Sequence, residues 1–546
     1  MKKWLLIGIL IIAFANTHVL GQCDTIIPRE VTIIDGNQMN LVPGNSICLQ
    51  GGGRDFLLIK NIHGTAENPI VIKNYNGPVL IQTSGNYGVK ISNCSYIQMT
   101  GSGNSGVNYG IQILKVDNDL GTGISVTDLS TNVEIDHMEI ANIPIAGVYA
   151  KSDPDCNFNS TRDKFTMYNF WLHDCYLHDI VNEGLYIGST KYSIGQHLTC
   201  DGKDTLLFPH LMVGTRIYNN VVENTGWDGI QVSSSSMDCE VYNNIVRNDS
   251  YMEETFQMSG IIIGGGSQCD CYNNQILDGK GDGFDIFGLG NMKIYNNLIV
   301  NAGRTYKPQD PLAFKHGIYV GQTVTSPNAT FDFFNNTIVS PKSDGIKYSN
   351  NEAIKARFIN NLITNPGRLA EEGNQAYING TQPAIEKVTN YYAPDNAAVR
   401  FLNQSPDLYD LKPNSPAVNS GTNLFNEGIE TDMLDRERPF HTYYDIGAYE
   451  CHDPYASIDD KIKAETLIIF PNPTEANLNI ITSFSNDDVL KINVLNLEGR
   501  LENILLPAHE VYQNKIVIQL RGFTKGTYIL EVITKNTTFH RKFLVL

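Results

Sequence analysis

The sequence predicts an all-β chain in which a parallel β-helix is followed by a small β-sandwich. The first observation is a recurring Gly-apolar-variable-apolar pattern, which begins at Gly88, Gly110, Gly147, Gly184, Gly229, Gly260, Gly283, Gly317 and Gly345. The second is a Tyr/Phe/Ile-Asn-Asn pattern that alternates with it, at residues 218–220, 242–244, 272–274, 295–297, 334–336 and 359–361. Both patterns are typical of short strands bounded by turn residues. The shortest glycine spacing is 22 residues, from Gly88 to Gly110, which suits one coil of a β-helix and excludes a β-propeller with its repeats of about 40–45 residues.

The size and composition of the chain fit a folded protein. It has 546 residues, of which 42% are hydrophobic, and this apolar fraction is too high for a disordered chain. The formal net charge is −18 and the pI is about 5.1. An acidic chain of this kind is not expected to bind nucleic acid or an anionic membrane surface. The charge excludes neither an enzyme nor a binding protein.

The amino terminus predicts a secretory signal peptide over residues 1–21. Lys2 and Lys3 precede an apolar run over residues 4–15, and Gly21 offers a small residue at the cleavage point. No later run approaches the roughly 20 apolar residues that a spanning helix needs, so we expect no transmembrane segment in the mature chain. All ten cysteines follow the cleavage point. In an exported protein they permit disulfide bonds, whose pairing the sequence leaves open.

From about Val31 to about Glu450, the glycine and Asn-Asn patterns resemble those of right-handed parallel β-helix proteins of the pectate-lyase-like superfamily. We expect the second asparagine of each pair to stack in an internal ladder at one turn; these residues are Asn220, Asn244, Asn274, Asn297, Asn336 and Asn361. Cys175 takes the equivalent place one coil earlier. The segment from Ser415 to Glu450 is similar to the closing stretch of exported β-helix proteins, which implies that it covers the open end of the coil.

Alternating strands from Leu467 onward predict a separate β-sandwich. This tail resembles the type A carboxyl-terminal sorting domain of the type IX secretion system of Bacteroidetes, through Phe470-Pro-Asn-Pro, Asn496-Leu-Glu-Gly-Arg, Gly526-Thr-Tyr and Lys542-Phe-Leu-Val-Leu. The resemblance implies export through the periplasm and across the outer membrane by the type IX secretion machinery, to a secreted or cell-surface location. We therefore expect four segments: the signal peptide over 1–21, the β-helix with its closing segment over 22–452, a linker over 453–466 and the sorting domain over 467–546.

Two columns of polar residues are predicted on one sheet of the β-helix. The positions two after the glycines face outward on strands about 4.8 Å apart, and they are Lys90, Gln112, Tyr149, Tyr186, Gln231, Ile262, Asp285, Tyr319 and Lys347. The positions directly before the glycines are Glu183, Asp228, Ser259, Asp282, His316 and Asp344. Tyrosine rings between carboxylates and amides suit a saccharide chain in a groove, and the candidate binding residues are Tyr149, Tyr186, Gln231, Glu183 and Asp228. The same pattern also fits a solvated sheet face with Asp-Gly turns.

The densest polar group lies on three successive repeats. Asp282, Asp285 and Asp344 are candidate ligands for Ca²⁺, which prefers clustered oxygen atoms. Lys347, His316 and Tyr319 are candidate catalytic residues, and a lysine with a depressed pKa can act as a base. This combination suits a Ca²⁺-dependent polysaccharide lyase, in which the ion neutralises a uronate carboxylate while the base removes the adjacent proton.

Two other interpretations remain open from the sequence. The first is a glycoside hydrolase, with Asp228, Asp282 or Asp285 as general acid and base. The second is a non-catalytic glycan-binding or adhesive surface protein. The aspartate and Gly-His-Gly motifs of polygalacturonases are absent, and Tyr186 stands where an alginate-lyase strand similar to residues 182–188 has an arginine. The sequence therefore assigns no enzyme family.

Overall fold

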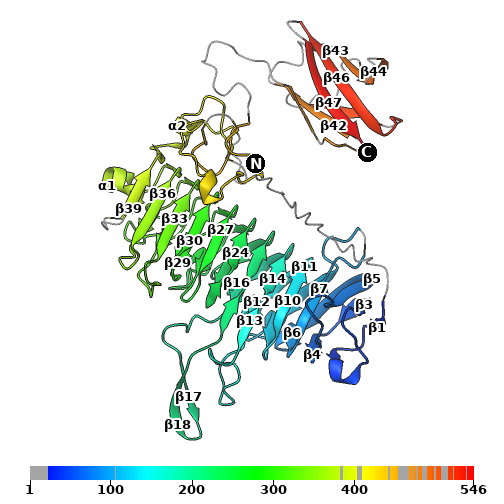
Figure 1. Ribbon diagram of the computed structural model, residues 1–546, viewed down its shortest axis with the longest axis vertical. Helices are drawn as coiled ribbons and strands as arrows, with labels where there is room; N and C mark the ends of the chain where they lie inside the picture. Colours follow the sequence, from blue (N-terminus) through cyan, green and yellow to red (C-terminus); the bar gives the residue numbers. More distant parts are fainter. Residues whose placement is uncertain are drawn as a thin grey trace, which may run out of the picture. The chain divides into compact units, whose positions relative to one another are not determined.

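The computed structural model describes residues 23–546 except 105, 381–384, 403–408, 441–442, 453–466, 471, 475–476, 483–488, 497–499, 506–514, 521 and 536–537. The predicted signal peptide and the predicted linker lie outside the described residues. The chain divides into two compact units between residues 456 and 457. The first unit is a parallel β-helix, whose strands follow one another in sequence order along its axis (Figure 1).

One wall of the coil is a parallel sheet of 12 strands. Its strands are β2 (Ile33–Asp35), β4 (Leu57–Lys60), β6 (Tyr87–Ser92), β9 (Thr122–Thr127), β12 (Ala146–Ala150), β16 (Glu183–Ile187), β22 (Ile230–Val232), β26 (Ser259–Ile263), β29 (Asp282–Ile286), β32 (Ile318–Val320), β35 (Ile346–Tyr348) and β38 (Ile378–Asn379). The repeat glycines lie at or beside the start of these strands, where neighbouring coils approach closely. At Gly184, for example, an added Cβ would lie 2.3 Å from the Gly229 carbonyl oxygen. We call this wall the glycine sheet.

The rest of the coil is a second sheet of 23 strands in two columns. The strands before the Asn-Asn turn are β1 (Thr25–Ile27), β3 (Ser46–Arg54), β5 (Ile70–Thr83), β7 (Ser95–Thr100), β10 (Thr131–Asp136), β14 (Phe170–His173), β20 (Arg216–Tyr218), β24 (Cys239–Tyr242), β27 (Cys269–Tyr272), β30 (Met292–Tyr295), β33 (Thr330–Phe334), β36 (Lys355–Ile359) and β39 (Ile385–Val388). Those after it are β8 (Ile111–Val116), β11 (Met138–Ile143), β15 (Tyr176–Ile180), β21 (Val221–Thr225), β25 (Ile245–Arg247), β28 (Gln275–Leu277), β31 (Leu298–Val300), β34 (Thr337–Val339), β37 (Leu362–Thr364) and β40 (Tyr391–Ala393). The strands β3 and β5 are long enough to belong to both columns.

The predicted asparagine ladder is confirmed. Each second asparagine donates from Nδ2 to Oδ1 of the next one, and the distance is 3.0 Å from Asn220 to Asn244 and from Asn244 to Asn274. The series continues from Asn361 to Asn390, which follows Thr389 and therefore does not match the Asn-Asn pattern. Cys175 begins the ladder as predicted, since its backbone N–H donates to Asn220 Oδ1 at 3.1 Å. The first asparagine of each pair has a positive φ, which asparagine tolerates better than most residues.

One predicted repeat is wrong. Gly110 and Gln112 belong to the turn before β8 and to β8 itself, and thus to the large sheet. The outward position after Lys90 is Ser125, which pairs with Lys90 and Tyr149. Gly110 matches the pattern for a local reason, because an added Cβ there would lie 2.1 Å from the Gly101 carbonyl oxygen. The shortest true spacing is therefore the 23 residues from Gly260 to Gly283.

Short elements lie between and beyond the coils. They are η1 (Gly36–Gln38), a sheet of β13 (Thr166–Tyr168), β19 (Leu211–Val213) and β23 (Ser235–Met237), the projecting hairpin of β17 (Gln196–Cys200) and β18 (Lys203–Leu207), α1 (Leu369–Glu372), η2 (Gly373–Ala376), α2 (Asn396–Val399) and η3 (Phe425–Glu427). The predicted closing segment packs on the last coils through buried residues such as Leu424, Tyr444 and Tyr449. Three disulfides, Cys23–Cys48, Cys156–Cys200 and Cys239–Cys269, confirm the expectation of disulfide bonding.

The second unit contains two antiparallel sheets around one apolar core, as the sandwich prediction requires. One sheet holds β41 (Leu467–Phe470), β42 (Asn477–Thr482) and β45 (Lys515–Gln519); the other holds β43 (Val489–Asn496), β44 (Leu501–Leu505), β46 (Gly526–Thr534) and β47 (Thr538–Val545). No helix among the described residues is long and apolar enough to span a membrane.

Candidate functional site

The outward column on the glycine sheet exists as predicted, apart from Gln112. Strand register aligns Lys90, Ser125, Tyr149, Tyr186, Gln231, Ile262, Asp285, Tyr319, Lys347 and Asn379. All the predicted site residues lie on or directly beside these strands. They separate into an aromatic part over the early strands and an acidic part over the later ones.

The aromatic part surrounds a groove over β6, β9 and β12. Two cavities of about 600 and 380 Å³ share Lys90, Thr127 and Tyr149 in their linings and together cross the sheet. The rings of Tyr149 and Tyr186 stack with their centroids 5.6 Å apart. Lys151 Nζ lies 5.2 and 4.8 Å from the centroids of these two rings. The groove thus offers aromatic surface together with polar side chains.

Two connected insertions follow β12 and β16, and the first of them borders this groove. The first, after β12, supplies lining residues that include Asp153 and Asn157. The Cys156–Cys200 disulfide ties it to the second insertion, which carries the β17–β18 hairpin. Arg162 strengthens the connection, because its guanidinium lies 4.2 Å from the centroid of the Tyr192 ring. The long insertion is therefore covalently tied to a loop that lines the groove.

The acidic part centres on an ion pair that involves a residue absent from the sequence prediction. Lys315 Nζ lies 2.7 Å from Asp282 Oδ2 and 3.0 Å from the Met258 carbonyl oxygen. Both side chains are largely buried. Burial lowers the pKa of Lys315, but the negative charges of Asp282 and Asp285 outweigh that effect and raise it, so the amine is an ammonium ion. Asp282 Oδ1 also accepts from the backbone N–H of His316 at 2.5 Å.

His316 lies between the two acidic strands. Its Nδ1 accepts from the backbone N–H of Asp344 at 3.2 Å, which leaves the proton on Nε2. Burial lowers the pKa of His316 to about 4, so the ring is neutral at pH 7. The ring also packs beside Tyr319, with centroids 5.9 Å apart.

Several buried carboxylate oxygens here have no hydrogen-bond partner among the described residues; they are Asp228 Oδ2, Asp249 Oδ2, Asp285 Oδ1 and Asp344 Oδ1. Burial raises the pKa to about 7 for Asp228 and to about 6 for Asp249 and Asp344. Burial and the charge of Asp282 also raise the pKa of Asp285. These acids therefore hold protons more readily than ordinary carboxyl groups do.

The structure brings some predicted residues together and separates others. Asp282 and Asp285 share β29, whereas Asp344 precedes β35, two strands away, with His316 between. Asp344 Oδ2 instead accepts a hydrogen bond from Asn379 Nδ2 at 3.1 Å and lies 3.9 Å from Arg368 Nη1. The three acids thus do not form one ligand set.

The predicted binding residues also differ in exposure. Tyr149 and Tyr186 are half-buried on the outer face, whereas Glu183, Asp228 and Gln231 are 3%, 0% and 1% exposed. Burial raises the pKa of Glu183 to about 7. The sequence prediction did not include Lys315 and Arg368, which lie at neither of the two repeat positions. It also did not include Asn379, which occupies the outward position on a strand where Tyr377 stands in place of the repeat glycine. Lys315 stands two residues before a repeat glycine, and this offset was the only signal for it.

Two family models match the chain. Residues 168–382 match the right handed beta helix region, and residues 468–546 match the secretion system C-terminal sorting domain. The second match confirms the predicted tail and indicates export by type IX secretion to the cell surface or beyond. A comparison with curated protein sequences finds no match.

Solved β-helix structures resemble the chain at low identity. The pectate lyase Pel9A is 12% identical, with a TM-score of 0.42 over 79% of this chain and 98% of that one. A GH136 lacto-N-biosidase from Eubacterium ramulus is 14% identical, with a TM-score of 0.40 over 66% and 63%. XylC in complex with xylose is 10% identical, with a TM-score of 0.35 over 88% and 95%. At these TM-scores the similarities indicate no activity.

Proposed function

We propose that this right-handed β-helix protein, which carries a type IX secretion sorting domain, is an exported polysaccharide lyase that acts on a uronate-containing chain. The observation that carries the proposal is the alignment of Asp285, Tyr319 and Lys347 on successive strands of the glycine sheet, next to the Lys315–Asp282 pair. A potential base, a hydroxyl group and a carboxylate thus stand at about 4.8 Å spacing on one face.

The reaction is a β-elimination. Lys347 Nζ takes the proton from the sugar carbon next to the uronate carboxylate. The electron pair of that C–H bond forms a carbon–carbon double bond, and the bond to the glycosidic oxygen breaks with its own electron pair on the leaving oxygen. Tyr319 donates its phenolic proton to that oxygen. Burial raises the pKa of Tyr319, so the proton is present at neutral pH, and His316 positions the ring by packing against it.

Asp282 and Asp285 fit a Ca²⁺ ion as partial ligands. Asp285 Oδ1 is buried without a partner among the described residues, and carboxylate oxygens are the ligands that Ca²⁺ prefers. Bound Ca²⁺ would supply a positive charge that neutralises the substrate carboxylate. The Lys315 ammonium already serves as a counter-charge for Asp282, so it competes with any cation there. Asp344 is too far along the helix to join these two ligands.

Tyr149 and Tyr186 are proposed to bind the same saccharide chain further along the face. Four strand steps separate Tyr149 from Asp285 in the column, which corresponds to about 19 Å. Ring faces and the polar groove residues suit sugar rings and hydroxyls. The substrate would therefore lie along the helix axis, across several strands.

The test is a screen of the full mature chain against acidic and neutral polysaccharides, with Ca²⁺ and with chelator. A lyase creates an unsaturated uronate, so ultraviolet absorbance should rise with an acidic polymer and not in the Lys347→Met variant. New reducing ends without absorbance would indicate a hydrolase instead and transfer the catalytic role to Asp228, Asp282 or Asp285. No cleavage of any polymer would reject the enzymatic proposal.

A non-catalytic glycan-binding protein is the second candidate. The observation that favours it is the position of the two cavities, which lie around Lys90 and Tyr149 rather than around Asp285. Retention of an intact polysaccharide by the protein, with loss of retention in Tyr149→Ala, would support this candidate.

A further inference from the structure

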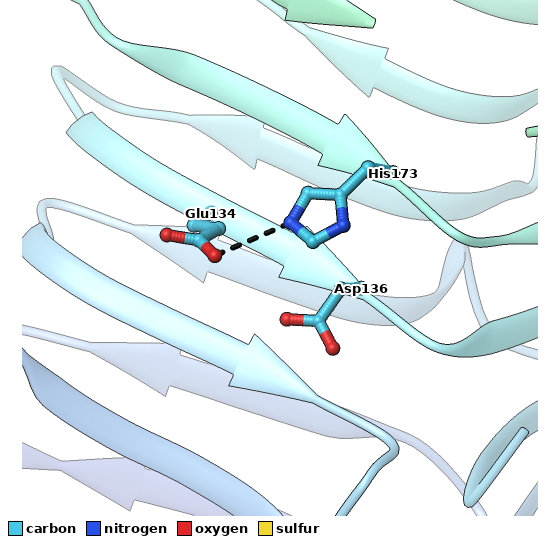
Figure 2. A group of neighbouring side chains, drawn as sticks. All are labelled: Glu134, Asp136 and His173. Carbon is cyan, nitrogen blue, oxygen red and sulfur yellow. Dashed lines mark hydrogen bonds and ion pairs between the residues drawn. The ribbon is translucent and has the colours of Figure 1, made fainter. Parts of the chain in front are cut away.

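Three metal-ligating side chains meet on the outer face of the large sheet, away from the glycine sheet. Glu134 and Asp136 lie two residues apart on β10 and therefore face the same side. His173 on β14 is directly opposite Asp136 in the strand register. Figure 2 shows the imidazole ring beside both carboxylates. One ligand atom from each residue lies within 4.8 Å of the others.

Each side chain in this group is held in place by further contacts. His173 Nδ1 lies 2.7 Å from Asp174 Oδ2, which leaves Nε2 directed at Glu134 Oε1, 3.2 Å away. A carboxylate on the second ring nitrogen is the arrangement that usually orients a metal-binding histidine. Asp136 Oδ1 lies 2.6 Å from His137 Nδ1. The potential ligands are thus fixed before any ion binds.

The charge at this position is strongly negative. Glu134, Asp136 and Asp174 surround His173, and Asp136 is only 2% exposed. Even with His173 and His137 both protonated, three carboxylates would leave an excess of one negative charge. Gln98 Nε2 donates to Glu134 Oε1 at 3.0 Å and to Asp136 Oδ2 at 3.1 Å. Rotation of that amide by half a turn would present its carbonyl oxygen to the same point, as a fourth ligand.

We propose that Glu134, Asp136 and His173 form a binding site for a divalent transition-metal ion. A histidine nitrogen with two carboxylates favours zinc or a neighbouring first-row metal over Ca²⁺, which takes oxygen ligands. The site does not depend on the lyase proposal, because it lies on a different sheet and shares no residue with that site. The site lies on a sheet, and the Tyr218 ring stacks on His173 with the ring centroids 4.4 Å apart. This rigid setting suits a structural ion.

The experiment is a titration of the metal-free, full mature chain with Zn²⁺ alone, followed by calorimetry and by metal analysis after desalting. We expect one Zn²⁺ whose affinity falls at least tenfold, or about 1.4 kcal/mol, in both His173→Gln and Glu134→Gln. The matched control is His178→Gln. His178 makes contacts of the same kind, from Nδ1 to Asp179 Oδ2 at 2.7 Å and from Nε2 to Glu139 Oε1 at 3.4 Å. Among the described residues, however, it is not part of a three-ligand group.

The outcomes separate the possibilities. Loss of Zn²⁺ in the two site variants, with retention in His178→Gln and in Asp285→Asn, supports the site. Equal Zn²⁺ binding by all four variants and the parent chain overturns it, as does a parent chain that binds none. Since His173→Gln removes a buried ring and can perturb folding, Glu134→Gln decides the case, because Glu134 is half-exposed.

Discussion

Lys315 Nζ lies 2.7 Å from Asp282 Oδ2, in a largely buried ion pair at the centre of the acidic part of the glycine sheet. Lys347 is half-buried on the outer column, one strand further along. The two lysines therefore have different environments and suit different roles. Lys315 keeps its proton and stabilises the acids, whereas Lys347 is the proposed base.

The first prediction concerns Lys347. Replacement by methionine keeps the apolar stem and removes the amine, so we expect a loss of about 10²–10⁴-fold in kcat. The melting temperature should stay close to that of the parent chain. Initial rates from ultraviolet absorbance and a thermal melt check both expectations, and undiminished turnover would remove Lys347 from the mechanism.

The second prediction concerns stability at Lys315. Lys315→Met leaves the buried Asp282 carboxylate without its cation, and loss of one partner of a buried pair costs about 3–5 kcal/mol. The double variant Lys315→Met/Asp282→Asn should recover part of that loss, because no unpaired charge remains. Thermal unfolding of the parent chain, Lys315→Met, Asp282→Asn and the double variant measures the coupling. A double variant as unstable as the sum of the single variants would contradict the ion-pair interpretation.

The third prediction concerns the tyrosine stack. Tyr186→Ala removes one of two stacked rings, and a contribution of about 0.5–1.5 kcal/mol corresponds to a roughly 2–12-fold rise in KM or Kd. Tyr242→Ala is the matched control, since Tyr242 belongs to a stack on the other sheet, 4.9 Å from Tyr218. If the control weakens binding as much as Tyr186→Ala does, the saccharide does not lie on the glycine sheet.

The fourth prediction concerns the ladder. Asn244→Ala removes the side-chain donor to the Ile217 carbonyl and the side-chain acceptor for the Asn220 backbone N–H inside the coil. Unpaired buried polar groups cost about 1–3 kcal/mol each, so the variant with two such groups should be less stable by about 2–6 kcal/mol. Asn243→Gly is the control, because Asn243 is exposed at φ 55° and glycine adopts that conformation easily. Equal melting temperatures for the two variants would contradict the ladder's contribution.

The fifth prediction concerns pH. Burial raises the pKa of Asp228 from 3.8 to about 7, so the folded chain holds this proton longer than the unfolded chain does. The contribution of Asp228 to stability therefore falls as the pH rises from about 4 to about 7. Asp228→Asn removes this dependence. The free energy of unfolding of the variant, relative to that of the parent, should therefore be higher at pH 8 than at pH 4 by on the order of 3 kcal/mol. The test is to measure the melting temperatures of both chains across this pH range in the presence of chelator. A constant difference between the two melting temperatures would contradict the assignment.

The sequence predicted the parts of the fold that repeat with the coil. The glycines and asparagines recur because every coil brings the same positions together, which made the column from Tyr149 to Lys347 visible. The assignment of Gly110 to the glycine sheet was wrong because β5 is 14 residues long and runs across two columns. The coil that contains β5 is therefore not built from the short pattern.

The remaining site residues depend on contacts that no repeat encodes. Lys315 reaches Asp282 across neighbouring strands from a position outside the two columns. Glu134, Asp136 and His173 lie on the other sheet, where no column was compared. The only signal for them in the sequence is that the two acids alternate with apolar residues over residues 133–136.

The most direct test of the lyase proposal is cleavage of a susceptible acidic polysaccharide in water enriched in heavy oxygen, with the products analysed by mass spectrometry. Elimination adds no water. We therefore expect products that carry a double bond and, when sampled before the new reducing ends exchange oxygen with the solvent, no label. Incorporation of labelled oxygen at the new chain ends would show hydrolysis and contradict the assignment of Lys347 as the base, and an uncleaved polymer would contradict the enzymatic function itself.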